Sequence, residues 1–173
     1  MTNNTPKTEL LYNNSKPIDH LNVSEAISLM IQEQKNASLE VKKTSKPIEI
    51  AINSIHKHLL SNPKGRLIYV GAGTSARIGV QDGVELLPTF NWPKERLDFI
   101  IAGGTQALLK ALENAEDNIE MAEKIVLEKS ISHEDVVIGL AASGNTPFTC
   151  KVLEKAKFKN ALTVAISNNT KGK

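Results

Sequence analysis

The chain has 173 residues, of which 40% are hydrophobic and 23% charged, a composition typical of a globular protein and unlike that of a disordered one. Its 21 basic and 19 acidic residues leave a net charge of +2 that is spread along the chain, so nothing calls for a nucleic acid partner. The single cysteine, Cys150, excludes an internal disulfide. No apolar stretch approaches the roughly 18 residues of a membrane span, and the amino terminus lacks a signal-peptide core, so we expect a cytoplasmic protein.

Residues 1–60 show helical patterns and no strand signal. Asn22 and Glu25 have the spacing of a capping box, and apolar residues then recur at helical intervals as far as Ile31. A second helical region is expected over about residues 37–60, with a break or kink at Pro47. We therefore predict an amino-terminal helical segment over residues 1–60, whose apolar stripes need a partner surface.

Beyond a turn at residues 61–65, short apolar runs alternate with helical stretches. The runs are continuous, as expected for strands that helices cover on both faces, and the alternation indicates a doubly wound, flavodoxin-like parallel sheet over residues 61–173. The predicted strands are residues 66–70, 97–102, 135–141 and 161–166. The predicted helices between them are residues 75–86, 105–114, 118–129 and 147–157.

Two of the predicted strands run into loops with the same chemistry. The first loop is Gly71-Ala72-Gly73-Thr74-Ser75-Ala76, and the second is Ala142-Ser143-Gly144-Asn145-Thr146-Pro147. Each combines glycine, hydroxyl groups and the start of a helix, where free N–H groups and the helix dipole favour an anion. Because the crevice of a sheet ordered 2-1-3-4-5 opens between strands one and three, we expect both loops to bind one ligand.

Other interpretations of the first loop are weaker. Its Gly71-x-Gly73-x-x-Ala76 pattern satisfies a loose dinucleotide fingerprint, but the acidic residue expected at the end of the second strand is replaced by Gly103-Gly104. The loop also lacks the Gly-Lys-Ser/Thr of a Walker A motif. In the alternative without a ligand, both loops are plain strand-to-helix turns. The hydroxyl groups favour a phosphate monoester such as a sugar phosphate.

The run from Gly65 to Ser75 resembles the opening strand and loop of the N-acetylmuramic acid 6-phosphate etherases, which are lyases with a sugar isomerase (SIS) fold. The likeness continues along essentially the whole chain. The further motifs are Glu85 with Pro88-Thr89-Phe90, Ile101-Ala102-Gly103-Gly104, Ala115-Glu116-Asp117 and Ala141-Ala142-Ser143-Gly144-x-Thr146-Pro147. Each motif alone would be common to many SIS proteins, whereas the ordered set is specific to the etherases.

The resemblance implies an enzyme that removes D-lactate from N-acetylmuramic acid 6-phosphate without a cofactor or a metal, leaving N-acetylglucosamine 6-phosphate. Glu85 would protonate the departing oxygen, and Glu116 would be the second carboxylate, the base at C2. The residues that would bind the substrate are Gly73, Thr74, Ser75, Ser143, Gly144 and Thr146. Ten helical residues after Ser75 place Glu85 about 15 Å along the helix axis. Either the helix bends, or Glu85 serves a neighbouring subunit in a homodimer.

The sequence departs from the family pattern at Ala76, Leu86, Leu87 and Asn145, where the etherases usually have Gly, Cys, Pro and Arg. Etherases also continue past the fourth strand, so we expect a carboxyl-terminally truncated SIS domain with weak or undetectable turnover. Three alternatives remain open at this point: a non-catalytic sugar-phosphate sensor, an inert remnant and an aldose-ketose isomerase.

Overall fold

The computed structural model describes Thr8, Leu10 and residues 16–169, and it divides them into two compact units. One unit is Leu10–Ser54, and the other contains the chain from Ile55 onward. The predicted boundary between the helical segment, residues 1–60, and the sheet domain, residues 61–173, stays a prediction. Within the described residues, no helix combines the length and apolar character needed to cross a bilayer.

The first amino-terminal helix begins where the sequence predicts. After a 3-10 turn at Ile18–His20, helix α1 (Val23–Lys43) starts with the expected capping box. The side chain of Asn22 accepts from the Glu25 N–H at 3.0 Å, and the Glu25 carboxylate accepts from the Asn22 N–H at the same distance. Helix α1 runs further than expected and ends at Lys43, so the expected start of the second helical region near residue 37 is wrong.

Helix α2 (Ser45–Ser61) begins directly after Thr44. Pro47 lies in its first turn, where the missing backbone N–H removes no intrahelical hydrogen bond. The predicted break is therefore present, but it falls three residues before the proline.

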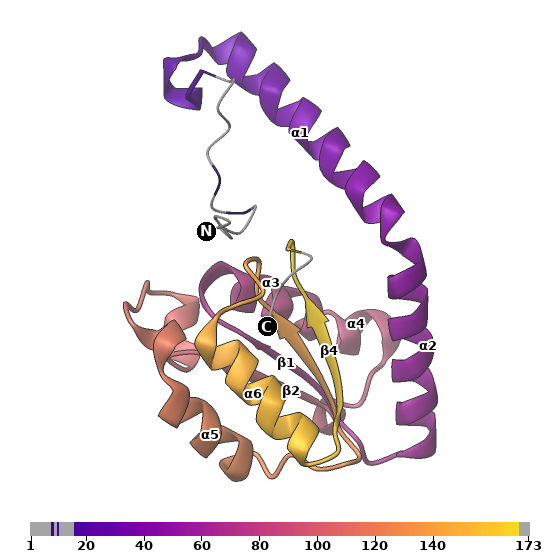
Figure 1. The fold of residues 1–173 in the computed structure, drawn as a ribbon. Helices are drawn as coiled ribbons and strands as arrows, with labels where there is room; N and C mark the ends of the chain where they lie inside the picture. The colour runs from indigo at the N-terminus through magenta and orange to yellow at the C-terminus, as the bar shows by residue number, and fades with distance from the viewer. Residues whose placement is uncertain (1–7, 9, 11–15, 170–173) are drawn as a thin grey trace, which may run out of the picture. The chain divides into compact units, whose positions relative to one another are not determined.

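A four-stranded parallel sheet forms the centre of the second unit (Figure 1). Its strands are β1 (Leu67–Gly71), β2 (Leu97–Ile101), β3 (Val136–Leu140) and β4 (Leu162–Ile166). They lie in the order β2-β1-β3-β4, with Gly71 paired to Ile101 on one side and to Leu140 on the other. The predicted doubly wound sheet is confirmed, and β1 and β3 are neighbours at its centre.

Helices cover both faces of this sheet. Helices α5 (Ile119–Glu128) and α6 (Pro147–Phe158) lie together on the face seen in front in Figure 1, and α3 (Gly73–Val84) packs on the other. The strands alternate accordingly: Ile68 and Val137 point to α5 and α6, whereas Leu67 and Val136 pack with Leu59 of α2. Phe148 of α6, which packs in the same group of buried residues as Ile68 and Val137, has no exposed surface.

The predicted helix over residues 105–114 is wrong. The structure has a short 3-10 helix, η4 (Thr105–Leu108), and then irregular chain up to a second 3-10 helix, η5 (Ala115–Asp117). Asn114, at a φ of +60°, is left-handed, which ends any helical path through the segment. The segment therefore forms a loop beside the carboxyl ends of the strands.

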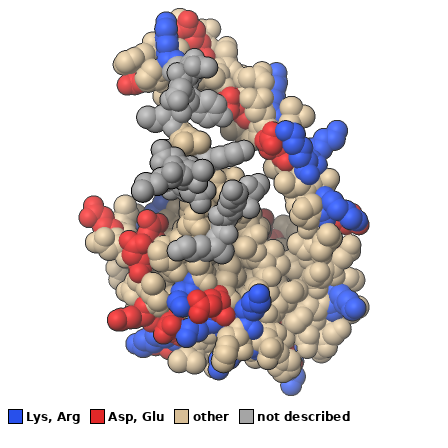
Figure 2. Space-filling view, in the orientation of Figure 1, with Lys and Arg blue, Asp and Glu red and all other residues tan. Residues whose placement is uncertain are grey.

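Charged side chains on the α6 face are interspersed by sign (Figure 2). Lys151 pairs with Glu154 at 2.8 Å, and Lys155 pairs with Glu123 of α5 at 3.1 Å. The lysines of α6 thus belong to a solvated face of mixed charge, as their spacing in the sequence predicts.

Candidate functional site

The first loop turns from β1 into α3 within two residues. Ala72 is the extended N-cap of α3, and Gly73, Thr74 and Ser75 form its first turn, whose N–H groups have no intrahelical acceptor. Gly71 is required by packing, because a Cβ atom there would lie 3.0 Å from the Ala76 nitrogen and 3.1 Å from the Leu140 carbonyl oxygen. Gly73 adopts a φ of +53° beside open space. The loop therefore presents free N–H groups and two hydroxyls at the end of the sheet.

The second loop turns from β3 into α6. The Ser143 hydroxyl accepts from the Asn145 N–H at 3.1 Å, and Gly144 adopts a φ of +71°. Thr146 lies at the N-cap position, as predicted, although its side chain makes no capping hydrogen bond, and Pro147 is the first helical residue. The loop is tied to the chain after β4, because the Asn169 side-chain amide donates to the Ser143 carbonyl at 3.0 Å.

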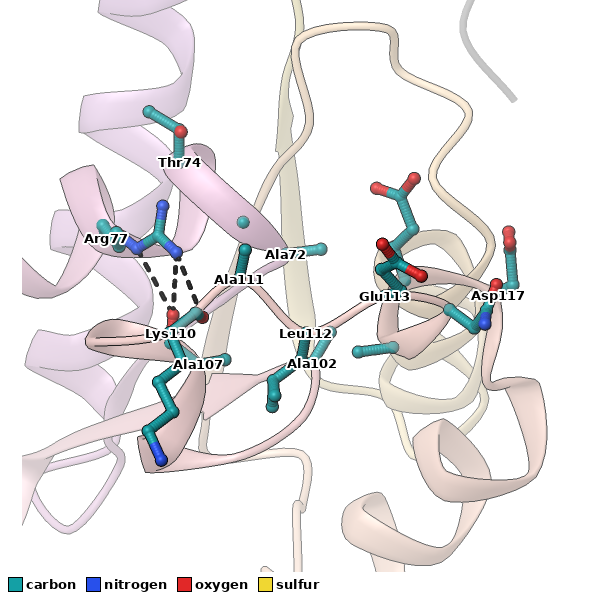
Figure 3. A pocket seen from close by; sticks show the side chains of 14 residues that line it. Ala72, Thr74, Arg77, Ala102, Ala107, Lys110, Ala111, Leu112, Glu113 and Asp117 are labelled. Atoms are coloured by element: carbon teal, nitrogen blue, oxygen red, sulfur yellow. Dashed lines mark hydrogen bonds between the residues drawn. The ribbon is translucent and has the colours of Figure 1, made fainter.

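A cavity of about 490 Å³ opens beside the first loop (Figure 3). Ala72, Gly73 and Thr74 line one side of it, and Ala102, directly after β2, also belongs to the lining. The segment of residues 107–117 forms the opposite wall, with the exposed carboxylates of Glu113, Glu116 and Asp117. The cavity therefore combines a helix amino terminus, suited to an anion, with carboxylates that can move protons.

This cavity contains only part of the predicted site. Gly73, Thr74 and Glu116 line it. Ser75 is in the same helical turn but outside the lining, and the lining includes neither Glu85 nor the second loop with Ser143, Gly144 and Thr146. Because β1 and β3 are adjacent, the two loops start from neighbouring strand ends about 4.8 Å apart. Joint binding of one ligand by both loops stays a prediction.

Glu85 lies at the far end of α3 from the first loop. It is exposed, and it joins α3 to the short helix α4 (Leu86–Phe90), which contains Pro88. Helix α3 runs without interruption from Gly73 to Val84, so the 12 residues between Gly73 and Glu85 correspond to about 18 Å of helix. A bend in α3 could have brought Glu85 back to the loop of its own chain. The unbroken helix gives this alternative no support.

Arg77 is a cavity residue that the sequence motifs did not single out. It projects from α3 one turn after Thr74, and its guanidinium group donates to carbonyl oxygens of the opposite wall (Figure 3). Arg77 lies three residues after Thr74 on a predicted helix, a spacing that places both side chains on one face. This spacing was the signal in the sequence that could have identified Arg77. What the sequence could not show was its partner segment, 30 residues further along the chain.

The parallel sheet, the two loops at its carboxyl end and the flanking helices define a SIS domain. Residues 49–157 match the family described as the glucokinase regulatory protein N-terminal SIS domain, and the chain belongs to this family. A solved structure with the same fold is the phosphoheptose isomerase GmhA from Neisseria gonorrhoeae, with a TM-score of 0.65 and 19% identity over 84% of this chain and 75% of that one. That likeness shows the fold.

The resemblance to the etherases is confirmed by curated relatives. The N-acetylmuramic acid 6-phosphate etherase of Clostridium acetobutylicum is 38% identical over 94% of this chain and 53% of its own length. The enzymes of that name from Pasteurella multocida and Actinobacillus pleuropneumoniae are 39% identical over 90% and 41% identical over 94% of this chain. The matched regions span 51% and 53% of the lengths of those two enzymes. The chain thus spans about half the length of the curated relatives it matches.

Proposed function

We propose that this chain carries the substrate site of an N-acetylmuramic acid 6-phosphate etherase. The observation that supports this most directly is one cavity that places Gly73 and Thr74 opposite Glu116. The phosphate would lie against the N–H groups and hydroxyls that begin α3, with Ser75 and the second loop, through Ser143, Gly144 and Thr146, closing around it. The sugar would extend toward the wall that carries Glu116.

The reaction needs one base and one acid. In the open-chain sugar the lactyl ether oxygen is β to the aldehyde, so Glu116 removes the proton from C2 while the C3–O bond breaks. The departing oxygen takes a proton from Glu85, which releases D-lactate and leaves a C2–C3 double bond. Water then adds its oxygen to C3 and gives a proton to the ionised Glu85, while Glu116 returns its proton to C2, which yields N-acetylglucosamine 6-phosphate. This chemistry requires positioned carboxylates.

A homodimer would supply Glu85. Because Glu85 lies about 18 Å along α3 from the phosphate loop, the proposal takes this glutamate from a second protomer. The exposed apolar residues on α1, with Val23 77% and Met30 58% exposed, offer surface for contacts between protomers. Light scattering after size-exclusion chromatography should then report twice the 18.9 kDa of one chain, and a monomer at micromolar concentration would contradict this part of the proposal.

The test of activity is incubation of a version extended to the length of the etherases with N-acetylmuramic acid 6-phosphate in water labelled with ¹⁸O, followed by detection of D-lactate and mass spectrometry of the sugar. Elimination and addition place the label on the sugar and none on the lactate. Glu85→Gln and Glu116→Gln should each lower turnover about 100-fold or more. Glu120→Gln, an exposed residue of α5 outside the cavity, is the matched control. Ligand binding without lactate release would favour the non-catalytic sensor.

Mixing the two inactive variants tests whether the site is shared. In a dimer of one Glu85→Gln and one Glu116→Gln protomer, one of the two sites regains both glutamates. Random reassociation makes half of the dimers mixed, so about a quarter of the wild-type activity should return. No recovery in a mixture shown to contain mixed dimers would mean that Glu85 and Glu116 act within one chain.

The proposal includes a cytoplasmic location. A single cysteine, which cannot form an internal disulfide, is consistent with a reducing compartment. Fractionation of cells that express the chain from its own gene would test this, and recovery in the membrane or secreted fraction would contradict it.

A further inference from the structure

Arg77 connects the two sides of the cavity. Its Nη2 donates to the carbonyl oxygens of Ala107 at 3.0 Å and Lys110 at 3.4 Å, and its Nε donates to those of Ala107 at 3.3 Å and Leu108 at 3.2 Å. The side chain is half-buried, and it reaches from the second turn of α3 to a segment that makes a 3-10 turn and then continues as irregular chain. One guanidinium group thus fixes the position of the wall relative to the phosphate loop.

The guanidinium group of Arg77 bonds to backbone carbonyl oxygens. Among the described residues, no carboxylate lies within ion-pair distance of its guanidinium, and every hydrogen bond it makes goes to a neutral carbonyl oxygen. Arginine carries five N–H groups in a fixed plane, and those of Nη1 make no hydrogen bond within the described chain. In Figure 3 the third nitrogen points away from the bonded carbonyls, on the side of Thr74. An unneutralised cation with unused donors therefore lines the cavity beside the helix amino terminus.

We propose that Arg77 both positions residues 107–110 as the cavity wall and donates, through Nη1, to the phosphate of the bound sugar. The inference rests on the proposed function for its ligand. Guanidinium groups suit phosphate oxygens because they stay charged and their N–H groups make strong, charge-assisted hydrogen bonds. The same contact would couple the phosphate to the wall, because the group that binds the anion also holds the segment that leads to Glu116.

Affinity for the product and for its unphosphorylated counterpart tests the contact. Calorimetric titration of the 173-residue chain with N-acetylglucosamine 6-phosphate and with N-acetylglucosamine isolates the contribution of the phosphate. Arg77→Gln should weaken binding of the phosphorylated sugar about tenfold or more and that of the neutral sugar much less, through the loosened wall alone. Arg77→Lys keeps the charge but not the fork, so it should recover part of this affinity.

Arg96 provides a matched control. It also donates to three backbone carbonyl oxygens, those of Gly65, Leu59 and Asn62, but it lies outside the cavity lining. Arg96→Gln should lower the melting temperature without changing either affinity. If Arg77→Gln and Arg96→Gln lost equal affinity for the phosphorylated sugar, Arg77 would have only a structural role, and the inference would be overturned.

Hydrogen exchange tests the wall. The N–H groups of Ala107 and Lys110 donate to the carbonyl oxygens of Gly104 and Gln106, so their exchange reports how firmly the segment is held. Both Arg77 variants should exchange faster there than the wild type, whereas Arg96→Gln should not. Unchanged exchange in Arg77→Lys would contradict the positioning role, and this variant decides the question if Arg77→Gln does not fold.

The outcomes separate this inference from the etherase proposal. If the wild type prefers the phosphorylated sugar through Arg77 but a version extended to the length of the etherases releases no lactate, the etherase proposal fails and the inference stands. If lactate is released and the Arg77 variants keep the wild-type KM and exchange, the inference alone fails. A wild-type chain with no preference for the phosphorylated sugar would also overturn the inference.

Discussion

Replacing Asp135 should test what holds β1 and β3 together at the amino ends of the strands. Its side chain is only 4% exposed and accepts four hydrogen bonds. Three come from Arg66, through its backbone N–H at 3.0 Å, Nε at 3.0 Å and Nη2 at 2.9 Å, and the fourth comes from the Ser132 N–H at 2.9 Å. Asp135→Asn keeps the volume but removes the charge and turns one acceptor oxygen into a donor group.

The expected loss follows from burial. Removing one partner of a buried ion pair costs about 3–5 kcal/mol, because the remaining charge is left without compensation. Arg66 retains Asp98 at 3.6 Å, and its own side chain is 22% exposed, so we expect the lower end of that range, about 3 kcal/mol. For a chain of this size, 1 kcal/mol corresponds to a shift in melting temperature of roughly 2–4 °C, so the fall should be about 6–12 °C.

Urea unfolding followed by circular dichroism at pH 7 gives the free energy of unfolding, and a thermal scan gives the melting temperature. Glu128→Gln is the control, because it breaks an exposed ion pair with Lys124 of 3.3 Å that should contribute at most about 0.5 kcal/mol. A loss below about 1 kcal/mol for Asp135→Asn, with an unchanged denaturant slope, would refute the reasoning that this carboxylate anchors the strands.

Three further outcomes are expected. Burial alone would raise the pKa of the Asp135 carboxyl, but hydrogen bonds from Arg66 and Ser132 outweigh it and lower the pKa below the ordinary value. This contribution to stability is therefore present above about pH 4 and lost as the pH falls through the lowered pKa, and urea midpoints from pH 7 to 3 should fall less steeply in Asp135→Asn. Gly104, at φ +72° and ψ −167°, occupies a region nearly restricted to glycine, so Gly104→Ala should destabilise by about 1–3 kcal/mol in the same urea assay although space is open around it. Tyr69→Phe removes the hydroxyl that donates to Asp82 at 2.9 Å and should lower the free energy of unfolding by about 1 kcal/mol, while an unchanged value would show that water replaces this bond fully.

The sheet could be predicted closely because its signal is local. Four continuous apolar runs gave strand positions within a residue or so of those observed, and two similar strand-to-helix loops marked β1 and β3 as the central pair. The capping box before α1 was equally predictable, since Asn22 and Glu25 contact one another within a single turn. In each case the residues that decide the structure are close in the sequence.

The cavity wall could not be predicted for the opposite reason. Residues 105–114 contain enough Ala and Leu for a helix, yet Gly103 and Gly104 both take positive φ values before it and Asn114 takes one at its end. Arg77 then binds the intervening carbonyls from another element. Glu116 itself stands in an exposed 3-10 turn, where a glutamate is usually just solvated. Only the resemblance to the etherases selected it.

Helix α3 sets the geometry that any etherase mechanism must satisfy. Gly79 and Gly83 let it lie close to the sheet, because a Cβ atom at either position would come within 2.6 Å of a side-chain carbon of Leu140 or Phe99. A helix packed this closely has little freedom to bend, so its two ends remain about 18 Å apart. Its first turn binds the phosphate in the proposal and its last residue precedes Glu85, so both can act on one sugar only if a second copy contributes one of them. A two-fold contact that brings the end of one α3 to the start of the other would create two such sites at once.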